Sequence, residues 1–144
     1  MTTVRDVAAY ILREQGSMTA MKLQKLSYYS QAWHLVWEDK PLFHDRIEAW
    51  ANGPVAPALY QLHRGHFEVT PTMISSDTPL DPDEVSTIEA VLGYYAEMTA
   101  WDLSRLTHSE DPWRDARSDL PPGARSASEI TPASMAEYYG ALSS

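Results

Sequence analysis

One stretch of this sequence gathers the side chains that general acid–base chemistry uses. Thr107-His108-Ser109-Glu110-Asp111 supplies hydroxyls, an imidazole and carboxylates in direct succession. A hydrolase could use His108 and the nearby carboxylates to move a proton. Catalytic groups usually converge on one point from different elements, however, because neighbours along a chain seldom face each other. We therefore predict that this stretch caps a helix, name no catalytic residue, and keep a hydrolase as an alternative function.

A metal site is the second chemistry that the residues could support. His63 and His66 could share a helix face, but Gly65 between them is expected to end that helix. The sequence has 0 cysteines, which excludes thiolate zinc sites, disulfides and a cysteine nucleophile. It also lacks a phosphate-binding glycine loop, a Gly-x-Ser-x-Gly elbow and a His-Glu-x-x-His pair. We predict no metal and no cofactor.

The negative charge of the chain lies in its second half. The net charge is -9; residues 1–66 hold 7 basic and 6 acidic side chains, whereas residues 67–144 hold 4 and 14. Such a surface repels a phosphate backbone, so nucleic acid is an unfavourable partner. A basic protein partner and a simple aid to solubility both remain open. Because the sequence shows neither a secretion signal nor a membrane-spanning stretch, we expect a cytoplasmic protein without membrane contact.

Apolar periodicity predicts one compact, mainly α-helical domain over residues 1–144. A short amphipathic helix precedes Gly16, and the helix over residues 20–38 contains no Gly or Pro and should be the longest. Further helices are expected at about 55–65, and from about residues 82, 100 and 132 onward, with a helical turn at 111–113. On the helix at 20–38 the polar residues share one narrow wedge, so we predict that most of its circumference is buried. The members of the wedge are Gln24, Ser27, Gln31, His34 and Glu38.

Between Lys40 and Trp50 the period changes to that of a strand. Pro41-Leu42-Phe43, a polar His44-Asp45-Arg46 turn and the alternating Ile47–Trp50 predict one short two-stranded β-hairpin. Asn52-Gly53-Pro54 then breaks the chain before the next helix. Residues 67–80 mix Thr, Ser, Pro and Asp without a period, which predicts a surface loop.

Lys25 interrupts the apolar arc of the second helix. Its stem could run along the core with the ammonium group in water or against a carboxylate, or its charge could be held at a groove for an acidic group of a partner. Trp50, at a strand end, and Trp113, on a short turn that we expect to be exposed, are candidate anchors, because aromatic rings on rigid corners form interface hot spots. The predicted partner-binding surface contains Lys25, Tyr28, Trp50, Pro54, Val55 and Trp113.

Three blocks of the sequence resemble the Panacea, or SocA-like, antitoxin family. The first is residues 18–33, with Leu23-Gln24-Lys25-Leu26-Ser27-Tyr28-Tyr29 at its centre, and the second is Ile47 to Tyr60. The third runs from Leu103 through Leu106-Thr107-His108-Ser109-Glu110-Asp111-Pro112-Trp113, and Tyr138-Tyr139 follows near the end. Asn52 departs from the family pattern, which has a bulky residue before Gly-Pro-Val, so no role of that side chain is carried over.

The resemblance implies an antitoxin that neutralises a cognate protein toxin by direct binding, in systems often carried by phages and mobile elements. One member of the family acts instead as a proteolytic adaptor that delivers its toxin to a protease, and this is the alternative. The resemblance supplies no catalytic residue. We therefore expect a binding protein and not an enzyme, with a toxin as partner and a protease as a further partner only if it is an adaptor.

Overall fold

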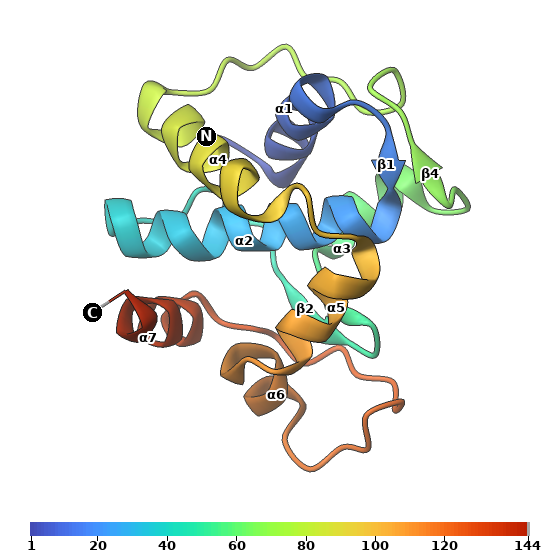
Figure 1. Ribbon diagram of the computed structural model, residues 1–144, viewed down its shortest axis with the longest axis vertical. Helices are drawn as coiled ribbons and strands as arrows, with labels where there is room; N and C mark the ends of the chain where they lie inside the picture. Colours follow the sequence, from blue (N-terminus) through green and yellow to red (C-terminus); the bar gives the residue numbers. More distant parts are fainter. Residues whose placement is uncertain (144) are drawn as a thin grey trace.

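The computed structural model describes residues 1–143, and its longest helix, α2 (Ala20–Glu38), runs through the middle of the molecule (Figure 1). The Thr19 side chain begins α2 by accepting a hydrogen bond from the backbone N–H of Lys22 at 3.2 Å. Asp39, in the left-handed conformation with φ 57°, ends it. Nearly all of α2 from Ala20 to Leu35 is buried, so the predicted position and burial of this helix are confirmed.

The main packing against α2 comes from α1 (Val4–Gln15), α4 (Pro82–Tyr95), α5 (Ala100–His108) and α7 (Pro132–Leu142). In Figure 1, α1 and α4 lie above α2 and α7 lies below it. Two shorter helices, α3 (Pro57–His63) and α6 (Asp111–Arg117), complete the α-helical part. The mainly α-helical fold class is therefore confirmed.

Side-chain caps begin α4, α5 and α7 where the sequence predicts these helices. Thr99 and Asp102 form a capping box at the start of α5, and Asp81 and Glu84 form one at α4, where Pro82 occupies the first turn. Thr131 caps α7 through the backbone N–H of Ser134. The expected turn at 111–113 extends into the full helix α6.

The polar wedge of α2 is buried as well, except for Glu38, and it fastens other segments to the helix. Gln24 Oε1 accepts the backbone N–H of Ala56 at 2.9 Å, at the start of α3. His34 Nδ1 lies 2.7 Å from Thr87 Oγ1 on α4. Because buried polar groups need partners, these contacts fix where each segment crosses α2.

The predicted hairpin exists, but its first strand is not where the sequence places it. The strands are β2 (Glu48–Trp50) and β3 (Gly53–Val55), paired antiparallel with Trp50 opposite Gly53. Residues 41–43 are not a strand, because Gln31 binds their backbone: Gln31 Oε1 accepts the N–H of Leu42, and Gln31 Nε2 donates to the carbonyl of Phe43, both at 2.7 Å. A side chain of α2 thus takes the hydrogen bonds that a partner strand would have supplied.

Pro54 fits within β3 because of its position in the register. It lies opposite Ala49, whose own backbone groups bind elsewhere: the N–H of Ala49 donates to Ser128 at 2.8 Å, and its carbonyl accepts from Arg117 at 3.0 Å. In an antiparallel pair such non-bonded positions alternate with bonded ones, so the missing N–H of proline costs the ladder nothing here. The segment predicted to break the chain is therefore partly strand.

Part of the predicted surface loop at 67–80 is also strand. Two residues, β4 (Glu68–Val69), pair antiparallel with β1 (Met18–Thr19) in a second small sheet. Ile74 is buried, and Arg5 Nε donates to the carbonyl of Ser75 at 2.8 Å. This segment is therefore tied to α1 and α2, which a pattern without a period did not indicate.

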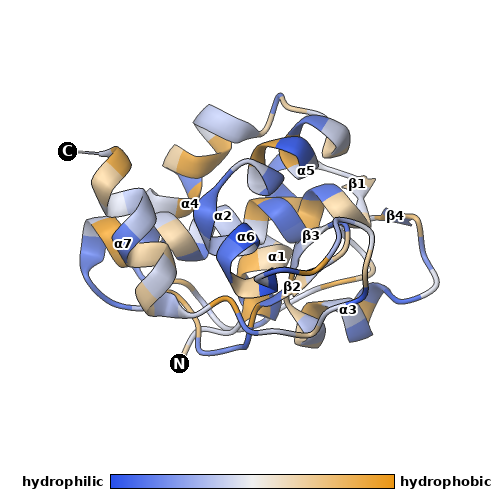
Figure 2. Ribbon diagram, turned by 90° about the horizontal axis from the view of Figure 1, so that it is seen from below, coloured by the Kyte–Doolittle hydropathy of each residue, from blue (hydrophilic) through white to orange (hydrophobic). Residues whose placement is uncertain are grey.

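Most helical ribbons carry both hydrophilic and hydrophobic residues, as amphipathic helices around a core do (Figure 2). The core contains residues from α1, α2, α4 and α7 and from the hairpin. Within residues 1–143, every helix is too short or too polar to cross a membrane.

Candidate partner-binding site

A hollow of about 580 Å³ lies beside Trp50, where the start of α2, the hairpin, α3 and residues 125–127 meet. We call it the Trp50 groove. Its walls are partly apolar, and its rim carries a carboxylate and a guanidinium group, which is the usual make-up of a recognition site. Its lining residues include Met21, Glu48, Trp50, Val55, Tyr60, His63 and Arg125.

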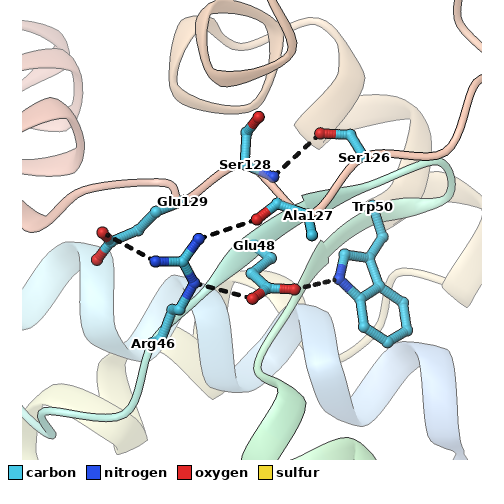
Figure 3. Close-up of polar contacts among 7 residues, drawn as sticks. All are labelled: Arg46, Glu48, Trp50, Ser126, Ala127, Ser128 and Glu129. Carbon is cyan, nitrogen blue, oxygen red and sulfur yellow. Dashed lines mark hydrogen bonds and ion pairs between the residues drawn. The ribbon is translucent and has the colours of Figure 1, made fainter.

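The Trp50 ring is held by a chain of polar contacts on β2 (Figure 3). Trp50 Nε1 donates to Glu48 Oε1, and Arg46 Nε donates to Glu48 Oε2, both at 2.8 Å. Arg46 also reaches the segment before α7, donating to the carbonyl of Ala127 at 2.9 Å and pairing with Glu129 at 3.4 Å. Glu48 therefore orients the indole while Arg46 joins the hairpin to the other wall of the groove.

Tyr60 and His63, on α3, form the inner wall. The Tyr60 ring meets the Trp50 ring edge to face at 5.0 Å between centroids and the His63 ring at 5.4 Å. Gln24 Nε2 lies 3.0 Å from His63 Nε2, and burial lowers the pKa of His63, so the imidazole is a neutral acceptor. His66, by contrast, is exposed, so the two histidines do not converge. In residues 1–143, no group of three or more His, Cys, Asp or Glu side chains is placed to hold a metal ion.

Trp113 supports the hairpin from behind. Its Nε1 donates to the backbone carbonyl of Trp50 at 2.8 Å. The indole is stacked on His108, with 3.9 Å between ring centroids, and the Arg117 guanidinium lies 4.8 Å from the Trp113 ring centroid. Only 6% of Trp113 is exposed, so the expectation of an exposed turn was wrong. The ring is buried because α6 packs it against β2.

Arg117 is a residue that the sequence reasoning missed. It is 3% exposed and donates to the carbonyls of Ala49, Pro121, Pro122 and Ala124. Arg117 thereby ties the hairpin to the loop that leads to the groove rim. The signal available in the sequence was its position four residues after Trp113, on the same helix face.

The Thr107–Asp111 stretch does not form an acid–base site. Ser109 ends α5, where its Oγ donates to the carbonyl of Leu106, whereas Glu110 precedes α6 without a capping hydrogen bond from its side chain, so the predicted cap is present only at the end of α5. The carboxylate of Glu110 accepts hydrogen bonds from Tyr29 at 2.7 Å and Tyr139 at 2.8 Å. His108 has no carboxylate partner: its Nε2 is buried without a hydrogen bond in the described chain, and burial lowers the pKa of His108.

Lys25 lies directly beneath the hairpin. It is 0% exposed, and its Nζ has no hydrogen-bond partner among residues 1–143. Burial lowers the Lys25 pKa from 10.5 to about 7. Gly53 closes the space above it: with φ 123°, a Cβ at this position would lie 2.5 Å from Lys25 Cε. The expectation that the ammonium reaches water or a carboxylate was therefore wrong, and it does not stand at a groove rim either.

The structure brings most of the predicted surface to one corner but exposes little of it. Trp50 is partly exposed and Val55 lines the groove, whereas Pro54 and Trp113 are buried around them with Lys25 underneath. Tyr28 lies apart, in a cluster where its hydroxyl is 3.0 Å from that of Tyr139. At this corner, Trp50 and its neighbours in the groove are therefore the residues that could touch a partner directly. The role of the six residues in binding a partner stays a prediction.

Comparison with known proteins assigns the chain to a family. The sequence model described as "Antitoxin SocA-like, Panacea domain" matches residues 23–114. The protein named "Antitoxin SocA" from Caulobacter vibrioides (strain NA1000 / CB15N) is 32% identical over 126 residues, which covers 76% of this chain and 67% of that protein. No solved structure shows a significant match. The matched residues contain most of α2, the hairpin, α3, α4 and α5, and thus most of the residues that line the Trp50 groove. This chain belongs to the antitoxin SocA-like, Panacea domain family.

Proposed function

We propose that this protein is a cytoplasmic antitoxin that binds a cognate protein toxin directly and neutralises it by covering the toxin's active surface. Membership of an antitoxin family supports the general role. The loop around His108 lacks a paired acid and base, which favours binding over catalysis. Covering the toxin's active surface requires a binding interface and no chemical reaction. The Trp50 groove is suited to such an interface.

The observation that carries this proposal is the way Trp50 is fixed at the edge of its groove. The indole is hydrogen-bonded to Glu48, packed against Tyr60 and backed by Trp113. A ring already held in one orientation loses little conformational entropy on binding, so more of its contact energy appears as affinity. Large aromatic residues in such positions typically form the centre of a protein interface.

Co-expression tests the proposal. The candidate toxin, which we take to be the protein encoded beside this gene, is produced in cells with and without this chain. Growth and the level of the candidate toxin are followed. We expect growth to be restored at an unchanged toxin level and the two proteins to copurify. Failure of this chain to restore growth would contradict the antitoxin role.

Measuring the toxin level also separates direct occlusion from proteolytic delivery. An adaptor would restore growth only while the toxin disappears, and the rescue would be lost in cells without the responsible protease. Restored growth with intact toxin in protease-deficient cells supports occlusion. Rescue that depends on the protease would overturn it in favour of an adaptor.

A further inference from the structure

A second groove, of about 680 Å³, lies along the C-terminal half of α2, between α4 and α7. We call it the aromatic groove. Its walls include Trp33 and Trp37 from α2, Tyr94 and Tyr95 from α4, and Tyr138 from α7. It is separate from the Trp50 groove, with which it shares no lining residue.

The aromatic walls are ordered, yet much of their surface faces solvent. Trp33 stacks on Trp37 with 5.2 Å between centroids, and Trp33 Nε1 donates to the Tyr95 hydroxyl at 2.9 Å. Trp37 is nevertheless 46% exposed and Tyr94 is 71% exposed. Large aromatic residues gathered in one exposed hollow are typical of interaction sites. Their electron-rich faces also attract cations.

Glu110 lies in the wall of this groove and is 6% exposed. Both of its tyrosine donors, Tyr29 and Tyr139, bind the same oxygen, Oε1. Within residues 1–143, Oε2 accepts no hydrogen bond, and no ion pair includes Glu110. A buried carboxylate that lacks a counter-ion is costly, and a cation entering the groove would relieve that cost.

The segment that supplies the α4 and α5 walls of the groove is also acidic in sequence. Over residues 81–111, which contain α4 and α5, a single basic side chain, Arg105, stands against eight acidic ones. These are Asp81, Asp83, Glu84, Glu89, Glu97, Asp102, Glu110 and Asp111. Two copies of this chain would repel each other at this face, whereas a partner that presents a cation would be attracted.

We propose that the aromatic groove receives a lysine or arginine side chain of the toxin, whose cation pairs with Glu110 while its methylene stem lies against Trp33, Trp37 and Tyr94. This inference rests on the proposed function, because the toxin is the partner. The groove supplies the two features that a long cationic side chain needs: aromatic faces for the stem and a largely buried carboxylate for the charge. The pair forms only in the complex, so it favours partners with a cation at this point.

Small esters test the cation site without a toxin. N-acetyl-lysine methyl ester and its uncharged counterpart, N-acetyl-norleucine methyl ester, are titrated into the protein while the indole N–H signals are followed by nuclear magnetic resonance. We expect the lysine ester to shift the signals of Trp33 and Trp37, and the norleucine ester to bind about tenfold more weakly. The signal of Trp50, in the other groove, serves as an internal control.

Two variants make the ester titration decisive. Glu110→Gln keeps an oxygen to accept the tyrosine hydroxyls but removes the charge, so it should abolish the preference for the lysine ester. Trp37→Ala removes an exposed wall without disturbing Glu110, and should weaken both esters. Equal binding of the two esters by the wild-type protein, or shifts at Trp50 alone, would overturn the proposal.

Toxin binding then separates this inference from the proposed function. Glu110→Gln and Trp37→Ala should each weaken toxin binding about tenfold or more, whereas Trp101→Ala, an exposed residue outside the groove, should not. If both variants bind the toxin as the wild type does, the inference fails and the antitoxin role stands. If the wild type neutralises no toxin, the proposed function fails and the ester titration still decides the cation site. A wild-type dimer disrupted by Trp37→Ala would assign the groove to a second copy and overturn the proposal.

Discussion

Lys25 and Glu110 are both buried without an opposite charge, but their surroundings differ. Lys25 lies in the first half of α2 and points to the hairpin, where Gly53 closes over its side chain and its nitrogen has no partner among residues 1–143. Glu110, by contrast, accepts two tyrosine hydroxyls and lines an open groove. One ionisable group is enclosed by the fold, and the other remains within reach of a partner.

This difference shows that the free-energy cost of burying an ionisable group can be relieved in two ways. An enclosed amine without an acceptor is least costly when neutral, which agrees with a Lys25 pKa of about 7. A carboxylate with two donors keeps part of its stabilisation, and a cation from outside can supply the remainder. Lys25 therefore affects the surface only by packing beneath Gly53, whereas Glu110 can take part in an interface.

The largest effect is expected at Gly53, because it covers Lys25. Gly53→Ala places a side chain on a backbone with φ 123°, 2.5 Å from Lys25 Cε, and should lower the free energy of unfolding by about 4 kcal/mol. Gly65→Ala is the matched control, since Gly65 has φ 88° with nothing within 4 Å of its added Cβ. Urea unfolding measures both. Equal losses in the two variants would show that Lys25 does not pack closely under the hairpin.

Removing the acceptor at Glu110 should have the next largest effect. Glu110→Leu leaves the hydroxyls of Tyr29 and Tyr139 without their acceptor and should cost about 3 kcal/mol of stability, whereas Glu110→Gln should cost less than about 1 kcal/mol. Thermal unfolding of both variants checks this. A Leu variant as stable as the Gln variant would mean that the tyrosine hydrogen bonds contribute little.

Lys25→Met should stabilise the protein, by about 2 kcal/mol near neutral pH. Between pH 10.5 and about 7 the unfolded chain binds a proton at Lys25 that the folded chain does not, so the contribution of Lys25 to stability falls as the pH falls. The advantage of Lys25→Met should be full below about pH 7 and shrink as the pH rises toward 10.5. Urea unfolding of both proteins at about pH 6 and about pH 9 measures it. An advantage independent of pH would contradict an uncompensated amine.

The difference in stability between Glu110→Gln and the wild type should change with pH in the opposite direction. Burial raises the pKa of Glu110 above 4.5, so the stability that this group contributes is full below that value and is lost as the pH rises through the raised pKa. Relative to the wild type, Glu110→Gln should therefore gain stability as the pH rises, whereas Lys25→Met gains stability as the pH falls. Two difference curves with the same slope would remove the contrast between the two groups.

A smaller effect is expected at His108, which stacks on Trp113 near Lys25. His108→Ala should lower stability by about 1 kcal/mol through the lost ring contact and leave toxin neutralisation measurable, because occlusion spreads its energy over an interface. Growth rescue by the variant is the readout. Loss of rescue by a stably folded His108→Ala protein would revive a hydrolase.

Local signals predicted much of this fold, because helix caps and apolar periodicity act within a few residues. The starts of α4 and α5 follow from their capping boxes, and the burial of α2 follows from its apolar arc. Contacts distant in sequence explain the differences. Gln31 binds the backbone at residues 42 and 43 and displaces the expected strand, and Gly53 covers a lysine 28 residues earlier in the chain.

The candidate site was predictable in part, for the same reason. Trp50 and the Asn52-Gly53-Pro54 corner could be located from their residue types, and the structure places a groove beside them. The cluster of Glu110, Tyr29 and Tyr139 joins three separate helical regions, so spacing along the chain gave no indication of it. Arg117 was missed because its acceptors are backbone carbonyls, which no residue type identifies, and its spacing from Trp113 was the one signal for it.

Calorimetric titration of the proposed cognate toxin into wild-type, Trp50→Ala and Trp101→Ala proteins tests the central claim most directly. Trp50 is fixed at the edge of its groove, whereas Trp101 is 69% exposed and lines neither groove. We predict that Trp50→Ala weakens binding about thirtyfold, or about 2 kcal/mol, with the fold intact, and that Trp101→Ala changes it less than about twofold. Unchanged affinity in a folded Trp50→Ala protein would contradict toxin recognition through the Trp50 groove.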